Sequence, residues 1–364
     1  MVMRTLAAAT LFVLLASCGS SAAVPGPTPT PSGNASPSPT VSTTPSTTSS
    51  PSPTVTAAPL PSPTPPPQVR AGADAYVSVS VATGWRNPGV VRAVDAPALQ
   101  NPAGIRQWLA AMSDRQKADL IDRADTQVLV GERVGVLAVA GGWAQVVVYA
   151  QSTPLDRRGY PAWIPVVQLT ALPPPPAANV ATVTAPTAWL RDASGAPVLE
   201  ASFGTRLPVV RTGTATIRVG LPGGRELSVD RALVSVTTST APALPSTAQA
   251  ILATARGFLG LPYLWAGTSG LGYDCSGLVY TVYRAHGILL PRDADAQALV
   301  GRAVARAALQ PGDLVFFTSN GYVHHVGIYA GNGTLIDSPH TGATVELVPL
   351  ATYTDYASAR RVTG

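Results

Sequence analysis

The sequence is poor in cysteine, lysine and charged residues. It contains two cysteines, Cys18 and Cys275, and a single lysine, Lys117, in 364 residues. Two cysteines so far apart exclude the dense disulfide framework of small secreted domains. Charged residues make up only 12% of the chain, and its basic residues form no cluster with interleaved aromatics. We therefore expect no nucleic-acid binding, in spite of the net charge of +5.

Long apolar runs are also missing. The run Leu6–Leu15 is too short to span a membrane as a permanent helix. It follows the basic residue Arg4 and leads into Leu15-Ala16-Ser17-Cys18, an order typical of a signal peptide. The last four residues resemble the bacterial lipoprotein box, which implies cleavage before Cys18 and lipidation of that residue. The alternative for residues 1–18 is an ordinary secretion signal in which Cys18 has no role.

Residues 19–70 consist mainly of Pro, Thr, Ser and Ala and carry no charge before Arg70. Such a segment cannot bury a core, so we expect a disordered tether. At about 3.1 Å per residue it would reach roughly 150 Å. The sequence therefore predicts an exported protein that is lipid-anchored to the membrane and faces the cell wall.

A unit rich in strands is predicted over residues 71–176. Alternation at period two predicts a strand over residues 75–81. Asn101–Pro102 is expected to open one helix, and Ser113 with Gln116 forms a capping box that opens a second. Further strands are expected at residues 126–130, 134–139 and 143–148, and residues 158–165 close the unit. Short strands between glycine-containing turns are typical of a small barrel, and the pattern resembles a bacterial SH3-like domain with a helical insert.

A second, shorter unit made only of strands is predicted over residues 180–240, between proline-rich boundaries at residues 173–176 and 242–245. Its strands are expected to include residues 182–183, 188–190, 206–210 and 233–236. We interpret this unit as a second SH3-like barrel.

The third unit, residues 246–364, carries the candidate chemistry. Ser246 with Gln249 is expected to cap its first helix. A loop rich in Gly and Ser, residues 267–272, then leads to Cys275, and the periodic apolar residues beyond it predict a helix that begins near this cysteine. The positive end of a helix dipole favours a thiolate, so Cys275 is a candidate nucleophile. The alternative, a small buried hydrophobic residue, is disfavoured because an unpaired cysteine is unusual in an exported domain.

A thiol nucleophile needs a base, and the base needs an orienting group. His324 and His325 are adjacent on a predicted strand, so only one of them can face Cys275. Residues 331–333 predict a hairpin turn, after which Asp337 returns close to His325. A carboxylate there can set the imidazole tautomer. A helix with the nucleophile against an antiparallel sheet with the base is an α+β arrangement.

The other polar residues near this set leave alternatives. His286 lies three turns along the Cys275 helix, and we expect it at the surface. His340 is a rival orienting group, and Asp337 is, in the alternative interpretation, only a residue at the end of the hairpin.

Five motifs of the third unit occur in a fixed order. They are Leu261-Pro262-Tyr263-x-Trp265, Asp274-Cys275-Ser276-Gly277-Leu278-Val279, Leu290-Pro291-Arg292, Gln310-Pro311-Gly312-Asp313-Leu314 and His325-Val326-Gly327-Ile328-Tyr329. Together they resemble the NlpC-type cell-wall cysteine peptidases, which have a circularly permuted papain-like fold. The resemblance implies that Cys275 is the nucleophile, His325 the base and Asp337 the third member, at a position that is often His. It also implies that Tyr263 helps the oxyanion site beside the Cys275 backbone N–H.

The first unit resembles the subfamily whose SH3-like domains accompany γ-D-glutamyl-L-diamino acid endopeptidase activity (dipeptidyl-peptidase VI). The likeness lies in the helical insert, in residues 125–129 and in residues 158–163. It implies that the cleft is narrowed by the first unit and holds the free amine of an N-terminal L-Ala and the D-Glu carboxylate. The implied substrate-binding residues are Asp274, Ser276, Asp125, Tyr160 and Trp265. This chain departs from the pattern of the subfamily at two positions. The position of Asp125 is often Glu, and Ala294 stands where Ser is common. In the alternative interpretation, Asp125 and Tyr160 do not bind substrate and are only residues at a strand end and at a barrel corner.

The sequence thus predicts a peptidoglycan hydrolase that cleaves the γ-D-glutamyl-diamino acid bond of stem peptides, by acyl-enzyme chemistry without a cofactor or a metal. The sequence does not distinguish between meso-diaminopimelate and L-Lys as the diamino acid of the substrate. The alternative is a tethered cell-wall-binding protein with an inactive peptidase domain. The intact set of Cys275, His325 and Asp337 disfavours that alternative.

Overall fold

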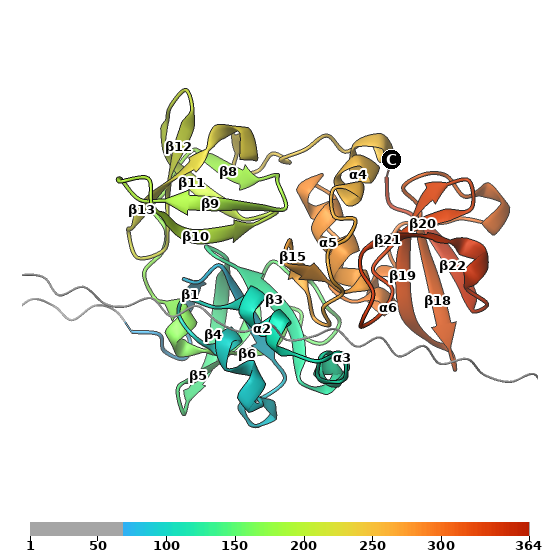
Figure 1. The fold of residues 1–364 in the computed structure, drawn as a ribbon, viewed down its shortest axis with the longest axis horizontal. Coiled ribbons are helices and arrows are strands. Elements are labelled where there is room, and N and C mark those ends of the chain that lie inside the picture. Colours follow the sequence, from blue (N-terminus) through green and yellow to red (C-terminus); the bar gives the residue numbers. More distant parts are fainter. Residues whose placement is uncertain (1–67, 364) are drawn as a thin grey trace, which may run out of the picture. The chain divides into compact units, whose positions relative to one another are not determined.

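A computed structural model describes residues 68–363 of the chain. The predicted signal peptide, Cys18 and the tether up to residue 67 lie outside the described residues. Three large sheets follow one another along the described chain, a two-stranded sheet precedes the last of them, and helices accompany the first and the third large sheets (Figure 1).

The first sheet has seven antiparallel strands in the order β3-β2-β6-β5-β4-β1-β7. Their alternating side chains enclose an apolar core that includes Val77, Val128, Val146 and Ile164. The strands are β1 (Asp74–Val77), β2 (Val81–Trp85), β3 (Ala124–Leu129), β4 (Arg133–Ala140), β5 (Trp143–Val148), β6 (Tyr160–Pro165) and β7 (Leu169–Thr170). The single strand expected over residues 75–81 is wrong, because the chain bends at residues 78–80 and β1 and β2 pair with different neighbours.

A helical insert separates β2 from β3. It contains α1 (Ala96–Leu99), α2 (Ile105–Ala111) and α3 (Asp114–Ala118). Trp108 of α2 packs against Trp85, with ring centroids 5.7 Å apart. The capping box of Ser113 and Gln116 is confirmed. The helix expected to open at Asn101–Pro102 begins instead at Ile105, because the Asn101 side chain donates to the Val167 carbonyl and holds that segment as a loop.

The second sheet also has seven antiparallel strands, in the order β10-β9-β13-β12-β11-β8-β14. They are β8 (Asn179–Val183), β9 (Thr187–Arg191), β10 (Pro197–Ser202), β11 (Arg206–Thr212), β12 (Thr216–Gly220), β13 (Glu226–Asp230) and β14 (Val234–Thr238). Its core is a separate apolar cluster that includes Ala181, Leu190, Leu207 and Ile217.

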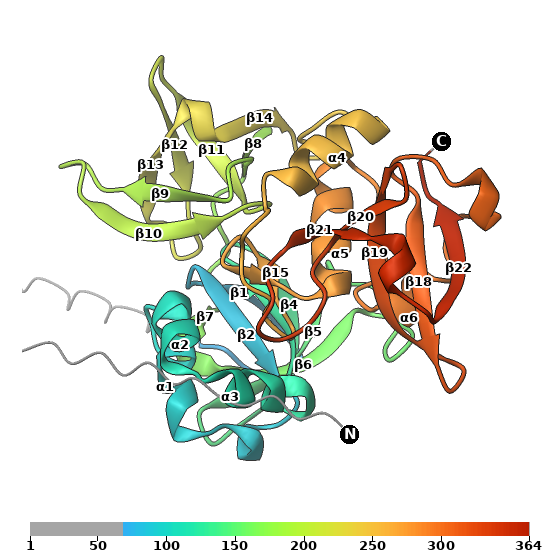
Figure 2. The same ribbon diagram turned by 45° about the vertical axis from the view of Figure 1, so that its right-hand side comes forward.

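The third part combines α4 (Ala248–Arg256), α5 (Cys275–Ala285) and α6 (Ala294–Gln297) with a six-stranded antiparallel sheet, and α5 lies beside that sheet (Figure 2). The sheet order is β17-β22-β18-β19-β20-β21. Its strands are β17 (Arg302–Ala303), β18 (Leu314–Ser319), β19 (Tyr322–Gly331), β20 (Thr334–Asp337), β21 (Glu346–Pro349) and β22 (Tyr356–Arg361), and a small hairpin of β15 (Thr268–Ser269) and β16 (Gly272–Tyr273) precedes α5. This part is the predicted α+β arrangement.

Two predictions about the helices of the third part are wrong. The cap of α4 is Thr247, whose hydroxyl accepts from the Ala250 N–H, and not Ser246. His286 is buried and not at the surface, because it contacts the Thr254 hydroxyl of α4 and the Pro245 carbonyl. Within residues 68–363, no helix has the length and apolar character needed to cross a membrane.

The first and third parts are joined by side-chain contacts. Gln127 of β3 accepts hydrogen bonds from the Thr268 N–H at 3.2 Å and from the Ser269 hydroxyl at 2.9 Å. Trp265 donates its indole N–H to the Ala124 carbonyl at 2.8 Å. The edge of the first sheet therefore lies directly beside the loop that leads to Cys275.

Candidate active site

Cys275 is the first residue of α5, as the sequence predicts, and it is buried. Asp274 is the cap, because its carboxylate accepts from the Gly277 N–H at 2.6 Å. This position places the sulfur at the positive end of the helix dipole.

Gly277 explains why a glycine stands two residues after the nucleophile. A Cβ atom at this position would lie 2.0 Å from the Gly267 carbonyl oxygen. The first turn of α5 therefore packs directly on the backbone of the preceding loop, which fixes the position of Cys275.

His325 lies on β19 opposite Phe317 of β18. It is buried, whereas His324 is exposed and pairs with Asp355 at 2.7 Å. The prediction that only one of the two histidines faces the nucleophile is therefore confirmed by their opposite environments.

Asp337 lies on β20 and is fully buried. Its Oδ2 lies 2.8 Å from the His325 Nε2, which confirms that the hairpin returns Asp337 to His325. Since Asp337 engages Nε2, Nδ1 is the ring nitrogen that remains available to Cys275. His340 is exposed and contacts the Thr341 carbonyl, so it is not the orienting group here.

The charges around His325 favour its protonated form. Burial lowers its pKa, but the carboxylate of Asp337 and the charge on Cys275 outweigh burial, so the pKa of His325 lies well above its usual value. An imidazolium beside the sulfur is the partner that a thiolate nucleophile requires.

Tyr353 is a member of this cluster that the sequence did not reveal. Its hydroxyl donates to Asp337 Oδ2 and lies 3.3 Å from the His325 Nε2. Its ring packs on Phe317, with centroids 4.2 Å apart. Tyr353 follows a short 3-10 turn and belongs to no motif, so only the fold brings it to the site.

Tyr263 is also buried beside the nucleophile. Burial raises its pKa, and the negative charges of Cys275 and Asp274 raise it further. The phenol therefore keeps its proton at neutral pH and can act as a hydrogen-bond donor.

Asp274 and Ser276 are held by a buried arginine. Arg292 donates to both carboxylate oxygens of Asp274, at 3.1 and 2.6 Å, and to the Ser276 hydroxyl at 2.9 Å. It also donates to the Thr126 hydroxyl of β3 at 3.0 Å. The Asp274 carboxylate thus already accepts hydrogen bonds from the first turn of α5 and from Arg292, which disfavours an additional bond to a substrate amine. The sequence contained Arg292 in a motif, but its partners could not be assigned from spacing.

Asp125 and Tyr160 meet a second carboxylate, Asp293. Burial raises the pKa of Tyr160, and the negative charges of Asp293 and Asp125 raise it further. Burial raises the pKa of Asp125 although Arg86 donates to it, and burial also raises the pKa of Asp293 although Arg292 is near. The first sheet and the third part thus bring two carboxylates to one tyrosine.

The cluster of Cys275, His325 and Asp337 can perform nucleophilic acyl transfer. A thiol at a helix N-terminus, an imidazole whose pKa the thiolate raises and a carboxylate that orients the imidazole are the parts of a cysteine peptidase site. Among residues 68–363, no group of three or more His, Cys, Asp or Glu side chains is arranged to hold a metal ion.

The chain belongs to the NlpC/P60 family, and it is a cysteine peptidase of the peptidoglycan-hydrolase type. The model of that family matches residues 260–362, and the model of the YKFC SH3b2 domain matches residues 183–236. The chain is 38% identical over 300 residues to a γ-D-glutamyl-L-lysine dipeptidyl-peptidase of Bacillus cereus, which covers 79% of this chain and 90% of that protein.

A second curated relative and a solved structure are also similar to this chain over most of its length. A γ-D-glutamyl-L-lysine dipeptidyl-peptidase of Bacillus subtilis is 37% identical over 278 residues, which cover 74% of this chain and 92% of that protein. The crystal structure of an NlpC/P60 family protein from Bacillus cereus superposes with a TM-score of 0.76 at 37% identity, covering 80% of this chain and 100% of that one. The predicted fold class is therefore confirmed, and the circular permutation relative to papain stays a prediction.

Proposed function

We propose that the protein cleaves the bond between γ-D-Glu and the diamino acid of peptidoglycan stem peptides, and that it prefers peptides with a free N-terminal L-Ala. The observation that carries this proposal is the half-buried pair of carboxyl groups on Asp125 of β3 and Asp293 just before α6, whose negative charges both act on Tyr160 of β6. The names of the two Bacillus relatives, γ-D-glutamyl-L-lysine dipeptidyl-peptidase, favour the same bond.

The charges of this cluster leave room for one more cation. Arg292 is satisfied by both oxygens of Asp274, and Arg86 is shared by Asp125 and Asp122. Asp293 has no ion pair of its own among the described residues, and burial raises its pKa, which acts against its charged form. A substrate ammonium bound there would supply the missing counter-charge.

The proposed reaction uses the side chains already described. The Cys275 thiolate attacks the γ-carbonyl carbon of D-Glu, while the Cys275 backbone N–H and the Tyr263 hydroxyl donate to the oxyanion. The C–N bond then breaks, His325 gives its proton to the leaving amine, and a thioester remains. Water, deprotonated by His325, hydrolyses the thioester and restores the thiolate.

The test is a comparison of two peptides, L-Ala-γ-D-Glu-L-Lys and its N-acetylated form, with the protein, its Cys275→Ala variant and its Asp293→Asn variant. We expect release of L-Ala-γ-D-Glu from the free-amine peptide only, no release by Cys275→Ala, and a raised KM for Asp293→Asn. Asp192→Asn, the same chemical change in the second sheet, serves as the control. The meso-diaminopimelate peptide, run in parallel, identifies the preferred diamino acid.

Three results separate the alternatives. Equal cleavage of both peptides would refute the amine site while leaving the catalytic set intact. No cleavage of either peptide, together with slow alkylation of Cys275 that does not change with pH, would favour a wall-binding protein with an inactive peptidase domain. An unchanged KM in Asp293→Asn would remove that residue from the site.

We also infer export and lipid anchoring through Cys18. This proposal is supported by the sequence of residues 1–18 and by the tether of residues 19–70. In the host cell, the unchanged protein should sediment with membranes and dissolve only in detergent, whereas Cys18→Ala should be released without detergent. Release of both forms would contradict the anchor.

A further inference from the structure

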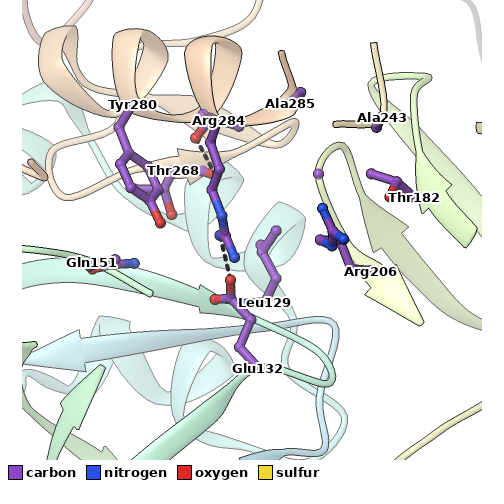
Figure 3. A pocket seen from close by; sticks show the side chains of 12 residues that line it. Leu129, Glu132, Gln151, Thr182, Arg206, Ala243, Thr268, Tyr280, Arg284 and Ala285 are labelled. Atoms are coloured by element: carbon purple, nitrogen blue, oxygen red, sulfur yellow. Dashed lines mark hydrogen bonds and ion pairs between the residues drawn. The ribbon is translucent and has the colours of Figure 1, made fainter. Parts of the chain in front are cut away.

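A small cavity lies where side chains of all three parts of the described chain meet, away from Cys275 (Figure 3). Its volume is about 20 Å³, which gives room for one particle of the size of a water molecule. Glu132 comes from the turn after β3, Arg206 from the start of β11 and Arg284 from the last turn of α5. None of these residues takes part in the proposed reaction.

Both carboxylate oxygens of Glu132, which lines this cavity, already accept hydrogen bonds. Glu132 accepts from Arg284 through Oε1 and from the Leu129 N–H through Oε2, the latter at 3.0 Å. Figure 3 shows Arg284 extending from α5 to Glu132, with Arg206 on another side. Two guanidinium groups therefore share the cavity with one carboxylate, which leaves one positive charge without a counter-charge.

Arg206 carries that surplus charge. Its only hydrogen bond among the described residues goes to the Ser239 carbonyl at 2.6 Å, and no carboxylate in residues 68–363 pairs with it. Burial and the like charge of Arg284 lower its pKa, so both effects act against the charged form of Arg206.

Thr182 adds a second, independent observation. It is only 2% exposed, it lines the same cavity, and its hydroxyl has no hydrogen-bond partner. Buried hydroxyl groups in native proteins nearly always have a partner. A donor without an acceptor beside a surplus guanidinium is the arrangement that an anion would complete.

We propose that this cavity binds one small monovalent anion, which is chloride under ordinary conditions, between Arg206, Arg284 and the Thr182 hydroxyl. The volume of about 20 Å³ leaves room for one small particle, which suits a single halide ion. A wider hollow of about 810 Å³ shares Arg206, Arg284 and Tyr280 with the cavity and gives a path for the ion. The bound ion would neutralise the junction and stabilise the packing of the two strand-rich parts against α5.

The first test measures the melting temperature of the protein as sodium chloride replaces sodium gluconate at constant ionic strength. A ligand that binds only the folded state raises the melting temperature as its concentration rises. We expect such a rise for the unchanged protein and for Arg211→Gln, an exposed arginine of the same strand. Arg206→Gln should show no rise, and Thr182→Val, which keeps the shape of the side chain, should need a higher chloride concentration for the same shift.

The second test locates the ion. Crystals of the protein grown in sodium bromide should give an anomalous peak in this cavity, within hydrogen-bond distance of Arg206 and Arg284. No peak there, or an equal chloride effect in Arg206→Gln and Arg211→Gln, would overturn the proposal. Stabilisation by sulfate but not by chloride would also overturn it, because it would place a larger anion in the outer hollow.

Discussion

Replacing Asp337 with Asn tests the proposed role of the carboxylate. Both donors, the His325 Nε2 and the Tyr353 hydroxyl, converge on Oδ2, whereas the buried Oδ1 has no partner. Asn would keep its oxygen at the Oδ2 position and place its amide nitrogen at the Oδ1 position. The geometry of His325 would then survive, and only the negative charge would be lost.

The magnitude follows from two contacts. A hydrogen bond to a charged group is worth about 1.5–3 kcal/mol, so kcat/KM should fall about 10- to 150-fold if the charge of Asp337 stabilises the imidazolium. The new amide N–H at the Oδ1 position would be buried without an acceptor, which costs about 1–3 kcal/mol of the free energy of unfolding.

The assay separates these two effects. Urea denaturation reports the loss of stability, and the rate of Cys275 alkylation by iodoacetamide against pH reports the ion pair. Without the Asp337 charge the pKa of His325 should move down, so the thiolate–imidazolium pair should be lost at a lower pH than in the unchanged protein. Asp355→Asn, the same change beside the exposed His324, is the matched control. An Asp337→Asn variant with wild-type kcat/KM and an unchanged alkylation profile would refute the reasoning.

Three more predictions concern Tyr353, Gly277 and His286. Tyr353→Phe removes one donor to Asp337, so kcat/KM should fall about 2- to 10-fold with an unchanged KM and a shifted pH profile; a wild-type profile would mean that the hydroxyl only fills space. Gly277→Ala forces the Gly267 carbonyl to move, so the free energy of unfolding in urea should fall by about 1–3 kcal/mol together with activity, and wild-type activity would contradict the close packing of α5. Burial lowers the pKa of His286, so the unfolded chain binds more protons than the folded one below about pH 6.5, and stability should drop as the pH falls through that value. His286→Gln should remove this part of the pH dependence, as measured by urea midpoints at pH 7 and pH 5, and an unchanged dependence would assign it to other groups.

The sequence allowed the central part of the site to be predicted because local geometry determines it. Cys275 follows a loop and opens a periodic helix, and both features are visible along the chain. The turn at residues 331–333 has positive φ angles at Asn332 and Gly333, of 50° and 68°. Such a two-residue turn is typical of a hairpin, and it places Asp337 beside His325.

The rest depends on tertiary contacts that leave no local signal. His286 was expected at the surface because the pattern of its own helix does not reveal that α4 packs on it. Tyr353 reaches Asp337 from a turn without periodic residues, and Asp293 meets Tyr160 across two parts of the chain. Propensity and spacing carry no information about such pairs, whereas a resemblance to known motifs could supply Asp125 and Tyr160 but not Asp293.

The hydrogen bonds of Arg292 have a consequence for how this protein is made. Arg292, which holds Asp274 beside the nucleophile, donates its side chain to the Thr126 hydroxyl of β3 and its backbone N–H to the Ser152 carbonyl in the loop between β5 and β6. Ribosomes synthesise the first sheet long before residue 292, so these acceptors can already be in place when α5 forms. A fragment that begins after the first sheet would keep Cys275, His325 and Asp337. Arg292 would then lose its hydrogen bonds to Thr126 and Ser152. Completion of the active site thus requires the third part to pack on the first, and removal of the first part would leave the side chains around Asp274 less firmly held.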